Sequence, residues 1–370
     1  MKKYAHLGLS GLLFAVLGVL MVSPNAQALS TVVVASNQTD GNILMTYALS
    51  SGGTLTPRYS FPTGGIGTGG GLGNQSGIAA NNNWLLVVNA GSDDISLFRT
   101  QSRGELSFRD KASSNGVRPV SVDIHNRLVY VLNVGDENSP SNITGFTIEG
   151  NGQLQMIPGS TTPVSADLTG AAQVAFSPNG QNLAVTEKAT NTIVTFSVDA
   201  ATGLLSNTVV NTSNGQTPFG FQWADNNTLI VSEAFGGTDS AVSEYDIEND
   251  GSLTSISPSV DAGDERAACW IALVPRTRLV LTTNTATGSI SSYERANNGG
   301  LTLLDSQAAL TGMGPIDLAV DHNGRAGAVL NAGDDSIQSF TISRSTGALV
   351  IKNTIAGIPD GSNGMVIVRR

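Results

Sequence analysis

Short apolar stretches separated by polar turns fill most of the chain, and they recur with a period of about 48 residues. The clearest unit is 86–106, LVVNAGSDDISLFRTQSRGEL, where two alternating stretches flank a polar turn and a glycine turn starts a third. The pattern returns at 328–349 as AVLNAGDDSIQSFTISRSTGAL. Apolar and polar residues that alternate with a period of two predict β-strands, so the chain reads as a repeat protein built from strands.

One aromatic residue and one leucine mark every unit at matching positions. The aromatic positions are Tyr47, Phe98, Phe146, Phe196, Tyr245, Tyr293 and Phe340. The leucines are Leu55, Leu106, Leu154, Leu205, Leu253, Leu301 and Leu349. Each unit has room for about four strands, as in VSVDI, RLVYVLN, NITGFTI and QLQMI within 121–157. The pattern predicts an all-β fold, a seven-bladed β-propeller with four-stranded blades, in one domain over 29–370.

The two ends of the chain predict how the ring closes. Middle units open with an additional apolar stretch, such as GIAA or PVSVDI, which the first unit lacks because it starts at STVVVASN. The chain ends with an additional apolar stretch, MVIVRR, at 365–370. We expect this C-terminal strand to become the innermost strand of the first blade, because the pairing removes two open sheet edges.

Residues 1–28 have the pattern of a secretory signal peptide. Lys2 and Lys3 precede an apolar run from Leu7 to Val22, and Ala26-Gln27-Ala28 is a small-residue cleavage site. Glycines interrupt the run, which favours a cleaved signal over the alternative, a membrane anchor. We expect an exported protein, periplasmic or extracellular, without membrane insertion after cleavage.

Composition and charge narrow the class of partner. The chain has 43 glycines, 40% hydrophobic and 13% charged residues, which suits a turn-rich β protein. Loss of Lys2 and Lys3 would move the formal charge from −10 to −12, which disfavours nucleic acid as a partner. The single cysteine, Cys269, cannot form an internal disulfide. We expect a monomer whose partner is a small molecule.

In a propeller, the starts of the innermost strands and the ends of the second strands meet at one mouth of the channel, the default ligand site. Five second strands end in asparagine, and two adjacent ones end in Glu187 and Glu233. Asparagine bonds the turn that follows it, whereas glutamate does so poorly. The two glutamates are therefore candidate catalytic carboxylates or ligands of a divalent cation, although no metal is required. Alternatively, Glu187 pairs with Lys188 or Arg266, and Glu233 caps a turn.

Further mouth candidates precede or begin the innermost strands. Arg118 and Arg266 could bind an anion or form ion pairs at the rim, and Lys188 follows Glu187. Candidate ligand contacts are Gln75, Gln173, Lys188, Phe219 and Trp270. Cys269 beside Trp270 also fits a buried thiol packed on an indole.

Two other features limit the chemistry. His125 and His322 fall in turns on the face away from the mouth, which argues against a Ser-His-Asp triad or a histidine-rich zinc site. The glycine-rich run at 64–77 leads into a strand, so we expect a flexible loop over the mouth and not a phosphate cradle. No haem-attachment motif is present, which disfavours a redox propeller.

The whole of the predicted mature chain, 29–370, resembles the lactonase family of seven-bladed propellers, which includes propeller-type 6-phosphogluconolactonase and fungal 3-carboxymuconate cyclase. The resembling stretches are 71–77, 89–98, 118–135, 172–188, 218–237 and 268–273. The resemblance implies a site at the channel mouth for lactone opening or closing. Glu187 falls where family members carry a strand-end glutamate. Ala172 and Gln173 replace a family His and Arg, and Val120 and Ser121 stand where another His is expected.

The predicted propeller, its mouth residues and the family resemblance lead to two hypotheses about function. The first is an exported lactone or ester hydrolase, in which Glu187 or Glu233 activates water while Arg118, Arg266 or Lys188 stabilises the oxyanion. The second is a non-catalytic propeller that presents its mouth to a small ligand, such as a sugar-like molecule or another metabolite, or to an envelope protein.

Overall fold

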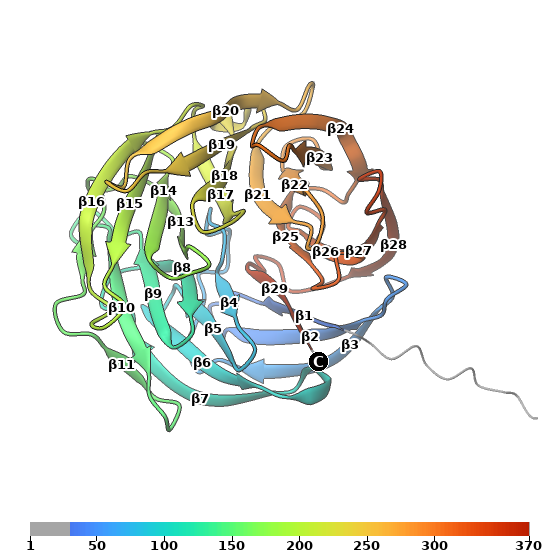
Figure 1. The fold of residues 1–370 in the computed structure, drawn as a ribbon. Coiled ribbons are helices and arrows are strands. Elements are labelled where there is room, and N and C mark those ends of the chain that lie inside the picture. The colour runs from blue at the N-terminus through green and yellow to red at the C-terminus, as the bar shows by residue number, and fades with distance from the viewer. Residues whose placement is uncertain (1–29, 370) are drawn as a thin grey trace, which may run out of the picture.

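The computed structural model describes residues 30–369, and it shows seven sheets arranged in a ring around a central channel (Figure 1). The predicted signal peptide, residues 1–28, lies outside the described residues. The seven-bladed β-propeller predicted from the repeat is confirmed.

From the channel outward, the first blade contains β29 (Met365–Arg369), β1 (Ser30–Ala35), β2 (Ile43–Leu49) and β3 (Leu55–Pro62). The second contains β4 (Ile78–Ala80), β5 (Trp84–Asn89), β6 (Asp94–Thr100) and β7 (Leu106–Ser113). The third contains β8 (Pro119–His125), β9 (Leu128–Asn133), β10 (Asn142–Ile148) and β11 (Leu154–Met156). In this blade Pro158 and Gly159 interrupt the outer edge, and the short β12 (Thr162–Pro163) also pairs with β10.

The fourth blade contains β13 (Ala171–Phe176), β14 (Asn182–Glu187), β15 (Thr192–Val198) and β16 (Leu205–Thr212). The fifth contains β17 (Pro218–Trp223), β18 (Thr228–Glu233), β19 (Ala241–Ile247) and β20 (Leu253–Asp261). The sixth contains β21 (Ala268–Leu273), β22 (Leu279–Asn284), β23 (Ser289–Arg295) and β24 (Leu301–Leu310). The seventh contains β25 (Pro315–Val320), β26 (Ala326–Asn331), β27 (Ser336–Ile342) and β28 (Leu349–Ala356).

The helical content of residues 30–369 consists of two single 3₁₀ turns, η1 (Ser102–Gly104) and η2 (Phe235–Gly237). Neither has the length or the apolar character that a helix needs to cross a bilayer.

The two ends of the described chain close the ring. Strand β29 pairs antiparallel with β1, from Ser30 opposite Arg369 to Val34 opposite Met365. The C-terminal strand is therefore the innermost strand of the first blade, as the sequence predicted, and β1 has no open edge.

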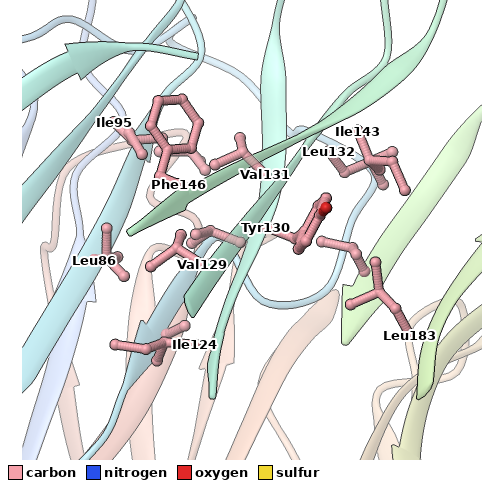
Figure 2. Packing of buried hydrophobic residues seen from close by; sticks show 14 of the residues in the cluster. Leu86, Ile95, Ile124, Val129, Tyr130, Val131, Leu132, Ile143, Phe146 and Leu183 are labelled. Atoms are coloured by element: carbon pink, nitrogen blue, oxygen red, sulfur yellow. The ribbon is translucent and has the colours of Figure 1, made fainter. Parts of the chain in front are cut away.

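The hydrophobic core lies between neighbouring sheets. Every repeated aromatic residue is buried, from Tyr47 to Phe340. Figure 2 shows one such layer, where Leu86 and Ile95 of the second blade meet Val129 and Phe146 of the third. This packing explains why one large residue recurs in each unit: every blade needs a ring or a branched side chain to fill the wedge against the next sheet.

Candidate functional site at the channel mouth

A short segment, 74–76, crosses the channel between the strands and ties several blades together. The side-chain amide of Gln75 accepts a hydrogen bond from the Ile271 backbone at 3.1 Å and donates to the Ile271 carbonyl at 3.0 Å, although the residues are 196 positions apart. Ser76 accepts from the Val122 backbone at 2.9 Å through its carbonyl. Below the mouth, the inner strands line a channel cavity of about 250 Å³.

Glycine at position 220 permits this crossing. A Cβ there would lie 1.9 Å from the Gln75 side-chain oxygen and 2.6 Å from the Cys269 carbonyl oxygen. Gln173 makes a similar pair of bonds, donating to the Phe221 carbonyl at 3.0 Å and accepting from its amide at 2.7 Å. The two glutamines predicted as ligand contacts therefore join inner strands to each other.

The glycine-rich run at 64–77 is fastened to the ring, which corrects the expectation of a flexible loop. Gly69 donates to the Asn37 carbonyl at 2.8 Å, and the Asn37 side chain donates to the Gly70 carbonyl at 2.7 Å. Gly67 has no room for a side chain, because a Cβ would lie 2.1 Å from the Asn37 backbone. Many glycines here permit close backbone contact and do not make a lid.

Glu187 is fully buried, and hydroxyl and amide donors occupy its carboxylate. One oxygen accepts from the Ser165 backbone at 3.0 Å, and the other accepts from the hydroxyls of Thr192 at 2.6 Å and Thr190 at 3.3 Å, with the Ser165 hydroxyl also bound. No ion pair of Glu187 with Lys188 or Arg266 occurs among the described residues. These contacts fasten the loop before β13 to the end of β14.

Glu233 occupies the corresponding position one blade further and is also fully buried. Its Oε1 accepts from the Gly215 backbone at 2.8 Å and the Ser243 hydroxyl at 2.7 Å, while Oε2 accepts from the Ser259 hydroxyl at 2.6 Å. The Tyr245 hydroxyl approaches Oε1 at 3.3 Å. The turn-capping alternative therefore describes Glu233. Catalytic roles for Glu187 and Glu233 stay predictions.

Blades with asparagine at this position have a carboxylate nearby. Asn89 donates to Asp94 at 2.6 Å, and Asn284 donates at 2.9 Å to the Ser289 hydroxyl, which in turn binds Glu265. An anionic acceptor thus recurs at several blade junctions, and only its position in the sequence differs. Glu187 and Glu233 are unusual because the carboxylate comes from the strand-end residue itself, but the local arrangement of a carboxylate beside the strand end is shared with other blades.

Lys188, next along the chain from Glu187, has very different surroundings. Its Nζ donates to the Gly73 carbonyl and lies 4.8 Å from the centre of the Phe219 ring. Burial lowers the pKa of Lys188 to about 8; the nearby Arg118 charge also lowers it, and Cys269 opposes the change. At neutral pH this amine deprotonates far more easily than an exposed lysine.

Phe219 and Trp270 form an aromatic wall beside the amine, with ring centres 5.0 Å apart. Trp270 is 3% exposed, and its indole N–H has no acceptor among the described residues. Cys269 is buried as expected, and burial raises the pKa of its thiol to about 11, so it stays protonated. The wall therefore offers one buried donor and no thiolate.

The two arginines at the rim differ in their relation to Lys188. Arg118 is exposed and has a left-handed backbone with φ of 55°. Its backbone amide donates to Asp93 at 2.7 Å. Its positive charge helps to lower the pKa of Lys188. Arg266 is also exposed, and its described contacts are made by its backbone alone. The structure thus groups Lys188, Phe219, Trp270 and Arg118, and it places Arg266 outside this group.

Metal ligands do not gather at the mouth. Over residues 30–369, no three side chains from His, Cys, Asp and Glu come together as a metal would need. His125 ends β8, and His322 lies in the turn after β25, so both are on the opposite face, as predicted. The sequence missed the Gly73 carbonyl that holds Lys188; its only signal was the glycine-rich run.

Comparison with known proteins identifies the family. The model of the lactonase family, a seven-bladed β-propeller, matches residues 75–238 and 224–362, more than half of the chain. No curated protein matches this chain significantly.

Solved structures share the fold at low sequence identity. A candidate 6-phosphogluconolactonase from Bacteroides fragilis is 18% identical, with a TM-score of 0.73 over 93% of this chain and 99% of that one. The periplasmic gluconolactonase of Pseudomonas aeruginosa is 16% identical, with a TM-score of 0.72 over 90% and 98%. At these identities the likeness establishes the propeller fold. Together with the match over residues 75–362, it shows that the chain belongs to the lactonase family of seven-bladed β-propellers.

Proposed function

We propose that this protein is a lactonase-type hydrolase that opens lactones at the channel mouth, with Lys188 as the base. The observation that carries the proposal is the Lys188 amine, which lies against the Phe219 ring with its pKa lowered to about 8 by burial. A base is most effective when its pKa lies near the working pH. Family membership supplies the reaction class, and this amine supplies a group able to perform it.

In the proposed reaction, neutral Lys188 removes a proton from water as the oxygen attacks the lactone carbonyl carbon. The tetrahedral intermediate collapses, the ring C–O bond breaks, and the departing alkoxide takes the proton back from the lysine. The product is a hydroxy acid. Arg118 lies near enough to affect the Lys188 charge, so it can also stabilise the oxyanion.

Trp270 has the role of substrate contact in this proposal. Its indole N–H is buried and has no acceptor in the described structure, so a shift of the side chain on substrate binding would let it donate to a lactone oxygen. The Phe219–Trp270 wall would pack against the apolar face of the ring. Glu187 and Glu233 have no part in the chemistry, because their carboxylates already bind hydroxyl and amide donors.

We further propose that the protein is exported. The support is the charged, apolar and small-residue pattern over 1–28, together with the periplasmic location in the name of the Pseudomonas aeruginosa relative.

A second candidate, a non-catalytic binding module, is favoured by one observation. The segment 74–76 lies across the channel and is hydrogen-bonded to the inner strands, so it separates the mouth from the cavity below. Such a surface suits a ligand or an envelope protein that binds without reacting.

The experiment is hydrolysis of a lactone panel by pH-stat, comparing the wild type with Lys188→Met, Lys188→Arg and Glu187→Gln. We expect the rate of the wild type to rise with pH through about 8, because the neutral amine is the active form. Lys188→Met should abolish turnover. Lys188→Arg should also be inactive, since it keeps the charge but cannot act as a base.

Glu187→Gln is the matched control, because it alters the neighbouring residue. With folded protein, it should retain most of the activity. Activity that persists in Lys188→Met, or collapses in Glu187→Gln alone, contradicts the assignment and favours a carboxylate base. Absence of turnover across the panel, with ligand binding at the mouth, would identify the binding module.

A further inference from the structure

A groove with a strong positive charge lies on the face opposite the mouth, between the sixth and seventh blades. Arg278 and Arg325 immediately precede β22 and β26, the strands that end at the mouth in Asn284 and Asn331. These arginines therefore lie at the far end of the ring, and Figure 1 shows the two blades side by side. The groove has a volume of about 880 Å³.

The groove is positively charged, whereas the whole chain is negatively charged. Its described lining contains four arginines and a single carboxylate, Glu294. The whole protein has 19 Lys and Arg against 29 Asp and Glu. A local excess of cations on an acidic protein concentrates anions at that surface. The four arginines that line the groove are Arg276, Arg278, Arg325 and Arg344.

Two of these guanidinium groups are already held in place. Arg278 forms an ion pair with Glu294 at 3.0 Å and also donates to Asn297. Arg344 donates to the carbonyl of Arg276 at 3.1 Å, which joins turns of neighbouring blades. These contacts fix the shape of the groove before a ligand arrives, which lowers the entropy lost on binding.

The other two guanidinium groups, those of Arg276 and Arg325, are exposed and have no hydrogen bond or ion pair among the described residues, since both arginines make contacts through the backbone alone. The positive field reaches beyond the groove. The pKa of His322 is lowered, mainly by burial and then by Arg369; Asp321 opposes the change, and Arg276 adds a smaller lowering effect. Arg276 and Arg325 are thus free to bind an external anion.

The remaining lining indicates which anion fits. Ser51, Thr341, Ser345 and Thr346 contribute hydroxyl groups, and the part of the lining that falls within residues 30–369 includes no aromatic side chain. Planar guanidinium groups bind phosphate through two parallel hydrogen bonds. Without aromatic rings there is no platform for stacking bases or sugar rings. The chemistry favours the phosphate groups themselves.

We propose that this groove binds a ligand carrying two or more phosphate groups, with Arg276 and Arg325 as the principal contacts. Either an inorganic polyphosphate or a phosphorylated sugar can supply these groups. The site is separate from the mouth and does not depend on lactone hydrolysis.

Calorimetric titration of the full chain tests the proposal, with inorganic tripolyphosphate and a hexose bisphosphate as probes at low ionic strength. We expect saturable binding of at least one probe, weakened by added salt. The Arg276→Ala/Arg325→Ala variant should lose about tenfold or more in affinity, because it removes both unpaired guanidinium groups from the groove. The probe that binds more tightly identifies the source of the phosphate.

Arg58→Ala/Arg103→Ala is the matched control, because it removes the same charge from exposed residues outside the groove. It should bind both probes as the wild type does. Equal weakening in the two double variants would show that bulk charge alone is responsible, and would overturn the site. Failure of both probes to bind the folded wild type, or binding of poly-aspartate in their place, would also overturn it.

Discussion

Glu187 and Lys188 are adjacent in the chain, both are removed from much of the solvent, and their surroundings are opposite. The glutamate accepts hydrogen bonds from Ser165, Thr190 and Thr192. The lysine has one carbonyl partner and an aromatic ring. Burial is costly for either charge, and the cost is offset only where enough partners replace water.

The comparison separates charges that hold the fold from charges that can react. Glu187 and Glu233 each accept hydrogen bonds from a preceding loop and so fasten that loop to the end of a second strand. Lys188 is less well solvated, which lowers its pKa to about 8 and makes its neutral form accessible. Strongly shifted pKa values cluster at functional sites, which makes Lys188 the better candidate for a reacting group.

Removing a fully partnered carboxylate should have the largest effect on stability. Glu233→Ala leaves the donors of Gly215, Ser243 and Ser259 buried without an acceptor. We expect a loss of about 3–5 kcal/mol in the free energy of unfolding, measured by urea titration. Glu105→Ala, at an exposed position, is the control and should change stability little. If the two variants unfold alike, Glu233 is not a structural anchor.

The lysine should behave in the opposite way. Lys188→Met removes a charge that burial penalises, so stability at pH 7 should stay unchanged or rise by about 1–2 kcal/mol. Because the folded pKa of Lys188, about 8, lies below the ordinary lysine pKa of 10.5, the wild type should gain stability as pH rises between these values. The variant should lack this gain in urea titrations at pH 7 and pH 10. A marked loss at pH 7 would mean that Lys188 is itself an anchor.

The repeat revealed the fold because each blade buries the same kind of residue at the same position. Tyr47 to Phe340 and the missing first strand predicted the blade number and the C-terminal closure. The bond from Gln75 to Ile271 left no local signal, since it joins residues 196 positions apart. Likewise, the strand-end position of Glu187 was visible, but its hydroxyl partners come from other loops and set its role. Arg127, Arg278 and Arg325 recur just before second strands, a signal that could have indicated the groove.

Asp123 has fewer hydrogen-bond donors than Glu187 and a smaller pKa shift than Lys188. Of the groups compared, it should have the smallest effect on the free energy of unfolding. Its Oδ2 accepts from the Phe176 backbone at 2.8 Å, but this does not offset burial, which raises the carboxyl pKa to about 6. The folded protein therefore favours the protonated form. Its stabilising contribution is complete below the unfolded pKa of about 4 and is lost as pH rises through 6.

Asp123→Asn should remove this dependence, because an amide oxygen can still accept from Phe176 and carries no charge. We expect the variant to exceed the wild type by about 1–2 kcal/mol at pH 7 and to match it near pH 4, in urea titrations at both values. Asp305→Asn, on a mostly exposed edge strand, is the control. A constant difference across pH would mean that Asp123 is solvated well enough to ionise normally. The number of hydrogen-bond partners would then not predict how much burial destabilises the charged form of each group.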